Sequence, residues 1–139
     1  MSRGLGDVYK RQGLDFDEED NGLIKLVSAN SNADGNVDDG FKLSEEDSGK
    51  VEVVFVDVSA ESNGGKGFVF EEADQGDLDA MVDDSTTSEN DGGDVGIEAV
   101  QEDQGSGTLT LTNTTVDETE NTGSGVSGVE VDGVELVDN

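Results

Sequence analysis

The side chains best suited to chemistry in this chain are oxygen ligands that recur at every second residue between positions 30 and 38. Carboxylate and amide oxygens are the ligands that Ca²⁺ prefers, and the ion takes roughly six to eight of them. The five candidate metal ligands are Asn30, Asn32, Asp34, Asn36 and Asp38. Their spacing predicts a calcium site, and calcium is the one cofactor for which the sequence supplies candidates.

This segment resembles an EF-hand-type calcium loop, with Gly35 at the sixth position and an acid at the ninth. Phe41 stands at the twelfth position, where such loops carry a bidentate glutamate, and no flanking helices are predicted. A second interpretation is that Asn, Asp and Gly simply form turns here, because their side chains and backbones favour turn conformations. Both interpretations stay open at this point.

Catalytic side chains are scarce. The chain has no histidine and no cysteine, which removes imidazole bases and thiol nucleophiles. Paired carboxylates of the glycosidase type are conceivable, but tryptophan is absent and there is a single tyrosine to stack on a sugar. We therefore expect no catalytic residue, no cofactor-binding residue other than the calcium candidates, and no enzyme activity.

The charge balance limits the partners. The chain carries 35 acidic and 7 basic side chains, a net charge of −28, and no base follows Lys66. Nucleic acids and anionic membranes are held by Lys and Arg, so neither is an expected partner. Cations, a basic protein partner or self-association remain. This acid-rich, lysine-poor composition resembles that of proteins from salt-loving microbes, in which roughly 1 M salt shortens the Debye length to about 3 Å.

The first twelve residues differ from the rest. Residues 2–12 (SRGLGDVYKRQ) resemble the conceptual translation of a transposon-end adapter used in sequencing libraries. We therefore interpret residues 1–12 as a non-native segment from an environmental assembly and expect that the natural N-terminus is lost. Residues 13–139 are then a single acidic domain.

Valine-rich segments with alternating polarity predict strands. Residues 50–59 have apolar side chains on both faces, which indicates a central, covered strand. The loop at residues 63–67 suggests an antiparallel pair, and Asp132–Gly133 suggests a second hairpin with a type I′ turn. Residues 71–82 could form a helical turn, and residues 83–94 are the best candidate for a flexible linker.

These elements predict an all-β fold, a small antiparallel sandwich or meander with long acidic, partly disordered loops. We find no pattern that repeats at a fixed period and therefore reject a solenoid. The C-terminal third, above all residues 127–139 (SGVEVDGVELVDN), resembles strand–turn–strand segments of β-rich tail and fibre proteins of marine phages.

Together these features predict a non-catalytic structural or adhesive β-domain of an exported surface protein or a virion appendage. Its expected location is extracellular, on the cell surface or in the virion. Three alternatives stay open: a calcium-binding module, a largely disordered acidic chain that binds a basic partner, and a spurious or truncated reading frame.

Overall fold

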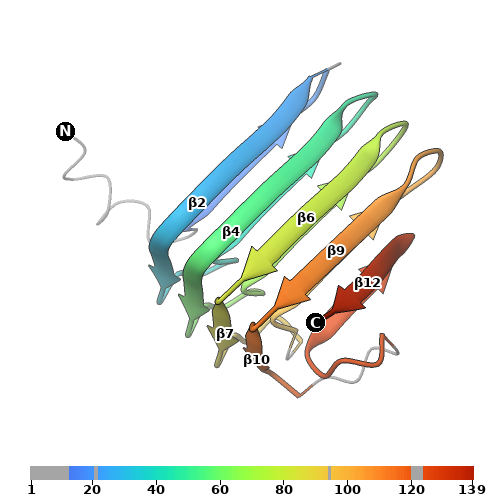
Figure 1. Ribbon diagram of the computed structural model, residues 1–139. Helices are drawn as coiled ribbons and strands as arrows, with labels where there is room; N and C mark the ends of the chain where they lie inside the picture. The colour runs from blue at the N-terminus through green and yellow to red at the C-terminus, as the bar shows by residue number, and fades with distance from the viewer. Residues whose placement is uncertain (1–12, 21, 94, 120–123) are drawn as a thin grey trace, which may run out of the picture.

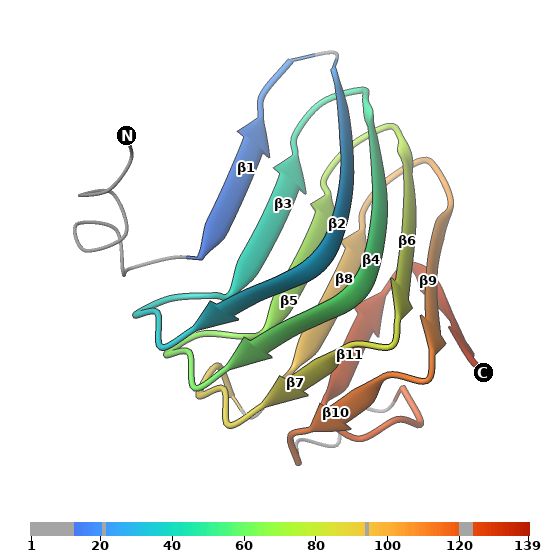
Figure 2. The same ribbon diagram turned by 60° about the vertical axis from the view of Figure 1, so that its left-hand side comes forward.

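The protein folds into a parallel β-solenoid of about four turns, as the ribbon of the computed structural model shows (Figures 1 and 2). The structure describes residues 13–20, 22–93, 95–119 and 124–139. Within these ranges the regular elements are twelve β-strands. No helix long and apolar enough to cross a membrane occurs in these ranges.

The strands form two sheets in which every pairing is parallel. The five-stranded sheet has the order β1 (Leu14–Glu18), β3 (Phe41–Glu45), β5 (Phe68–Glu72), β8 (Ile97–Gln101) and β11 (Val129–Asp132). The seven-stranded sheet has the order β10 (Thr115–Asp117), β7 (Thr86–Ser88), β4 (Lys50–Glu61), β6 (Asp77–Asp83), β9 (Gly107–Thr112) and β12 (Val134–Asp138), and β2 (Leu23–Asp34) pairs with β4.

The register shows a repeat of nearly constant length. Leu14 pairs with Phe41 and Phe41 pairs with Phe68, at intervals of 27 residues, and Phe68 then pairs with Ile97 after 29. The step from Ile97 to Val129 is 32 residues. Each coil therefore lies on the preceding one, and residues one repeat apart share the same face and the same column.

The long strands β2 and β4 bend at one recurring corner, which Figure 2 shows at the lower end of the seven-stranded sheet. Four residues with positive φ, between 46° and 56°, lie at this corner, one per coil: Asn30, Asp57, Asp84 and Asn113. Asn and Asp enter the left-handed region more easily than other residues with a Cβ. The corner divides the seven-stranded sheet into a long part and a short part and gives each coil three sides.

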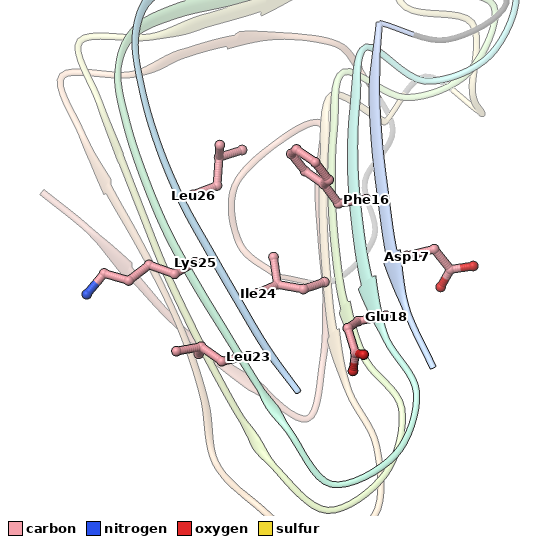
Figure 3. Close-up of a pocket in the computed structure, with 7 residues that line it drawn as sticks. All are labelled: Phe16, Asp17, Glu18, Leu23, Ile24, Lys25 and Leu26. Carbon is pink, nitrogen blue, oxygen red and sulfur yellow. The ribbon is translucent and has the colours of Figure 1, made fainter. Parts of the chain in front are cut away.

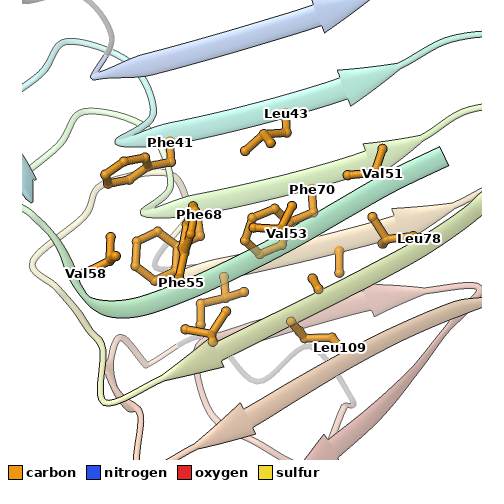
Figure 4. Close-up of a cluster of buried hydrophobic side chains, with 14 of the residues drawn as sticks. Phe41, Leu43, Val51, Val53, Phe55, Val58, Phe68, Phe70, Leu78 and Leu109 are labelled. Carbon is orange, nitrogen blue, oxygen red and sulfur yellow. The ribbon is translucent and has the colours of Figure 1, made fainter. Parts of the chain in front are cut away.

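The core consists of apolar columns between the sheets (Figure 4). Phe55 lies at its centre, with its ring centroid 5.1 Å from those of both Phe41 and Phe68. Phe55, Phe68 and Phe70 are completely buried. Full burial of such a side chain contributes roughly 1.5–3 kcal/mol, so these rings hold the middle coils together.

The all-β prediction is confirmed, but the antiparallel sandwich or meander is wrong, and so is the rejection of a solenoid. Residues 63–67 connect β4 to β5, which belong to different sheets. Gly133 does have a positive φ of 68°, as expected for a turn residue. The turn, however, leads from β11 in one sheet to β12 in the other, and each of these strands pairs with the strand one coil earlier.

Two further segments differ from expectation for the same reason. Within residues 71–82, the expected helical turn is replaced by the end of β5 and by β6. The segment at residues 83–94 contributes β7, and Ser85, Thr87 and Asn90 in it are buried. These polar residues occupy interior columns of the solenoid, so the lack of large apolar side chains does not indicate a loop here.

Candidate functional site

The structure places three of the five calcium candidates on the last part of β2 and the other two in the irregular segment that follows it. Asn30 is the corner residue with positive φ, and Asn32 and Asp34 follow it on β2 with exposed side chains. Asp34 Oδ1 accepts a hydrogen bond from the backbone N–H of Glu61 (3.2 Å). Asn36 turns into the interior, whereas Asp38 is exposed. Asn30, Asn32 and Asp34 lie on the extended strand β2, whereas Asn36 and Asp38 lie in the irregular segment after it, and calcium binding stays a prediction.

Asn36 is the first member of an asparagine ladder that runs through the solenoid. Its Nδ2 donates to Oδ1 of Asn63 (2.8 Å), and Nδ2 of Asn63 donates to Oδ1 of Asn90 (2.8 Å). Two of the amides also bind the backbone: Asn63 and Asn90 donate to the carbonyl oxygens of Ala33 and Ala60, both at 2.9 Å. Amide side chains can stack in this way because each one both donates and accepts.

The ladder ends at Glu118, whose buried carboxylate takes the next position. It accepts hydrogen bonds from Nδ2 of Asn90 (2.6 Å), the backbone N–H of Asn90 (3.3 Å) and Oγ1 of Thr87 (2.7 Å). An ionised carboxylate has no proton to donate. The ladder therefore has a direction, with donors pointing from the N-terminal coil towards the C-terminal one.

A second polar column consists of carboxylates. Glu18 lies in register with Glu45, Glu45 with Glu72, and Glu72 with Gln101. Glu45 and Glu72 are completely buried. Gln101 donates to Oε2 of Glu72 (3.2 Å), so a neutral amide follows the carboxylates in this column.

Glu45, in the middle of this column, is the least well satisfied carboxylate. Its Oε2 accepts from the backbone N–H of Gly49 (3.1 Å), but its buried Oε1 has no hydrogen-bond partner. Burial, followed by the neighbouring charge of Glu72, raises the pKa of Glu45 from 4.5 to about 7. Glu45 can thus hold a proton near neutral pH, because ionisation would leave two buried like charges in adjacent coils.

Glycines make room for the carboxylate column. A side chain at Gly49 would collide with the carboxylate of Glu45 and with the carbonyl oxygen of Gly22. A side chain at Gly76 would collide with the carbonyl oxygen of Gly49. Gly49 and Gly76 lie where the chain passes from the five-stranded sheet to the seven-stranded sheet. Close contact between successive coils at this point requires glycine four residues after each buried glutamate.

The interior residues of both columns escaped the sequence analysis, although a signal was present. The order Asn-x₃-Gly-Φ-x-Φ-x-Glu-x₃-Gly, with Φ apolar, occurs at residues 36–49 and again at residues 63–76. The two occurrences are 27 residues apart, which is the coil length seen in the register. Of the two asparagines that begin these repeats, Asn36 is a predicted metal ligand and Asn63 is part of a predicted hairpin loop.

The N-terminal end of the solenoid forms a hollow of about 260 Å³. Phe16, Ile24 and Leu26 point into the space between β1 and β2, and Glu18 lies at its edge, whereas Lys25 points away (Figure 3). Phe16 is 43% exposed, but Leu43 and Phe70, which follow it in the same column, are completely buried. This end is thus a cross-section through the apolar core.

The geometry defines a parallel β-solenoid whose interior carries an amide ladder and a proton-binding carboxylate column. Comparisons with protein families, with curated proteins and with solved structures found no match to the chain. Within the described residues, no group of three or more acidic side chains is arranged to hold a metal ion. The chemistry available at these columns is hydrogen bonding and the uptake of a proton.

Titration calorimetry tests the calcium prediction. A site at these five residues requires that Asp34→Ala lose the heat of calcium binding that the parent protein gives, because a carboxylate contributes most of the attraction for the ion. Equal heats for the two proteins, or no heat for the parent, would remove the site.

The asparagine ladder predicts a large effect of Asn63→Asp. The change replaces an amide donor by an oxygen that faces the acceptor oxygens of Asn90 and Ala33, and we expect a loss of about 3 kcal/mol in the free energy of unfolding. Urea unfolding measures this loss. Asn113→Asp is the matched control, since Asn113 is exposed. The equivalent corner positions of the two preceding coils already carry aspartate, Asp57 and Asp84. Equal losses in the two variants would contradict the ladder.

The carboxylate column predicts that stability falls as the pH rises from about 4.5 to about 7. Because the folded-state pKa of Glu45 is raised, the folded protein keeps a proton that the unfolded chain releases between about pH 4.5 and 7. Each rise in pH within this window therefore favours unfolding. Because glutamine does not titrate, Glu45→Gln should remove about 1–3 kcal/mol of that loss. Glutamine fits this column, since Gln101 already occupies the equivalent position.

Unfolding free energies at pH 5 and pH 8 are the measurement, and Glu46→Gln is the control. Glu46 is exposed, and its replacement by glutamine removes one acidic group from the chain, as Glu45→Gln does. Its stability should follow the pH profile of the parent protein. Parallel profiles for all three proteins would show that general charge repulsion, not the buried column, causes the pH dependence.

Proposed function

We propose that this chain is a non-catalytic structural β-domain that serves as a stiff spacer in an exported surface protein or a virion appendage. The observation that carries the proposal is the unbroken stacking of coils in both sheets. Every described strand pairs in parallel with a strand one repeat away, and the amide ladder links the first coil to Glu118. A spacer needs such continuous contact along its axis.

Burial and charge support the same role. Most apolar side chains are buried between the sheets, and most of the 35 acidic side chains remain on the outside, where water hydrates them. A chain with a net charge of −28 resists collapse onto other acidic surfaces. Hydration and resistance to association suit a segment that holds other parts of a molecule away from a surface.

Pulsed electron paramagnetic resonance on the full chain tests the spacer geometry. The protein has no cysteine, so labels at Lys25→Cys and Glu135→Cys are unique. These positions belong to one outward column and are four strand steps apart, roughly 19 Å between Cα atoms. Asp15→Cys with Glu130→Cys spans four steps on the other sheet and is the matched pair.

We expect narrow distance distributions with similar means for both pairs. Broad distributions would contradict a stiff spacer and favour the alternative of a disordered acidic chain. The proposed location has its own test, antibody labelling of intact cells or purified virions from a source that encodes the chain. Confinement of the protein to the cytoplasm, or turnover of a polysaccharide or ester substrate, would contradict the proposed role.

A further inference from the structure

The N-terminal end of the solenoid is an unfinished coil–coil interface. An apolar column that is buried in the next coils reaches the surface there: Phe16 is 43% exposed, whereas Leu43 and Phe70, which follow it in register, are completely buried. In the described part of the chain, β1 pairs only with β3, and β2 pairs only with β4. The other edge of each strand carries backbone groups that can pair with an added strand.

The asparagine ladder shows what this end requires. Asn36 donates its amide to Asn63, and no donor in the described residues reaches its own Oδ1. In each following coil the corresponding oxygen accepts from the amide one coil earlier. The first position is therefore an acceptor that is set for a donor from a preceding coil.

The opposite end does not supply that donor. The ladder finishes there in Glu118, whose carboxylate only accepts when ionised. Stacking two copies head to tail would bring this carboxylate towards Oδ1 of Asn36, so that two acceptors face each other. In a stack through the two N-terminal ends, the ladder donors of both copies point away from the contact, so neither ladder offers a donor there. The high negative charge of each copy opposes both arrangements.

We propose that the N-terminal end binds one further β-solenoid coil, added in parallel, with an amide side chain at the ladder position and apolar side chains pointing inward. Such a coil would pair its strands with β1 and β2, cover Phe16, Ile24 and Leu26, and donate to Asn36. This proposal goes beyond the spacer role and does not depend on where the protein resides. The direction of the ladder and the free edges of β1 and β2 define how such a coil would attach.

A duplicated coil in the full chain is the direct probe. A second copy of residues 13–39, inserted between Gln12 and Gly13, adds 27 residues, which is the interval between Gly13 and Gly40. The inserted coil then has the register on β1 and β2 that these strands have on β3 and β4. Its own Asn36 falls on the ladder position above the original Asn36.

Hydrogen exchange of the original β1 and β2 is the measurement. We expect at least tenfold slower exchange in these strands and weaker binding of a hydrophobic dye than in the parent protein. The matched control is the same insertion with Asn36→Asp in the added copy, which keeps the side-chain volume and removes the donor. It should lose most of the protection. No gain in protection from the unchanged insertion would overturn the proposal.

Experiments on the parent protein distinguish the proposed coil from two other occupants of this end. A concentration-dependent dimer in sedimentation, with β2 protected only in the dimer, would show that a second copy covers this end. Faster exchange of β2 after deletion of residues 1–12 would show that the chain's own first residues cover it. Either result would overturn the proposal, whereas a monomer with unchanged exchange after the deletion supports it.

Discussion

The stacking of each side chain on its counterpart one coil earlier is the constraint on which the rest of this structure depends. Parallel strands in register place equivalent residues about 4.8 Å apart, so every inward position must tolerate a close copy of itself. Apolar residues satisfy this condition by packing, and asparagine satisfies it by donating to one neighbour and accepting from the other. Carboxylates satisfy it only with a proton or with an amide neighbour such as Gln101.

The same constraint acts on the outward charges. Lysines in the described residues lie against acids: Lys25 contacts Glu52 (3.5 Å), Lys66 contacts Glu98, and Lys42 and Lys50 lie in register with Asp15 and Asp77. Each exposed pair is worth at most about 1 kcal/mol. The lysines offset only part of the repulsion, because Glu52 also lies in register with Asp79, and Glu98 with Glu130. In β9, beyond the last lysine, the outward positions are threonines, which avoid repulsion without a cation.

The sequence predicted the strands better than their pairing. Most of the expected strands lie where the valine-rich segments are, and β4 is central in its sheet, as expected. Its second apolar face, however, is not covered, because Val56 remains 38% exposed. The positive φ of Asp57 changes the alternation, so that Val58 turns inward after Phe55. Alternation alone contains no information about such a corner.

The polar columns explain why the pairing was missed. Glycine and asparagine at residues 63–67 favour a tight turn locally, and the same residues serve a corner between two sheets. Which of the two forms depends on contacts 27 residues away. The repeat that indicates the solenoid combines Asn, Glu and Gly with apolar residues at a spacing of 27, and the alternation within a single strand does not reveal it. Only Asn36 among the five metal candidates has an interior role, and that role is in the ladder.

Contacts between residues one repeat apart test this account most directly. In the nuclear magnetic resonance spectrum of the isotope-labelled protein, nuclear Overhauser effects between strand backbones report which residues are neighbours. The account predicts effects that connect Leu43 with Phe70 and Val53 with Ala80, each at an interval of 27 residues. Effects that connect β4 with β5, or β11 with β12, in antiparallel register would contradict it.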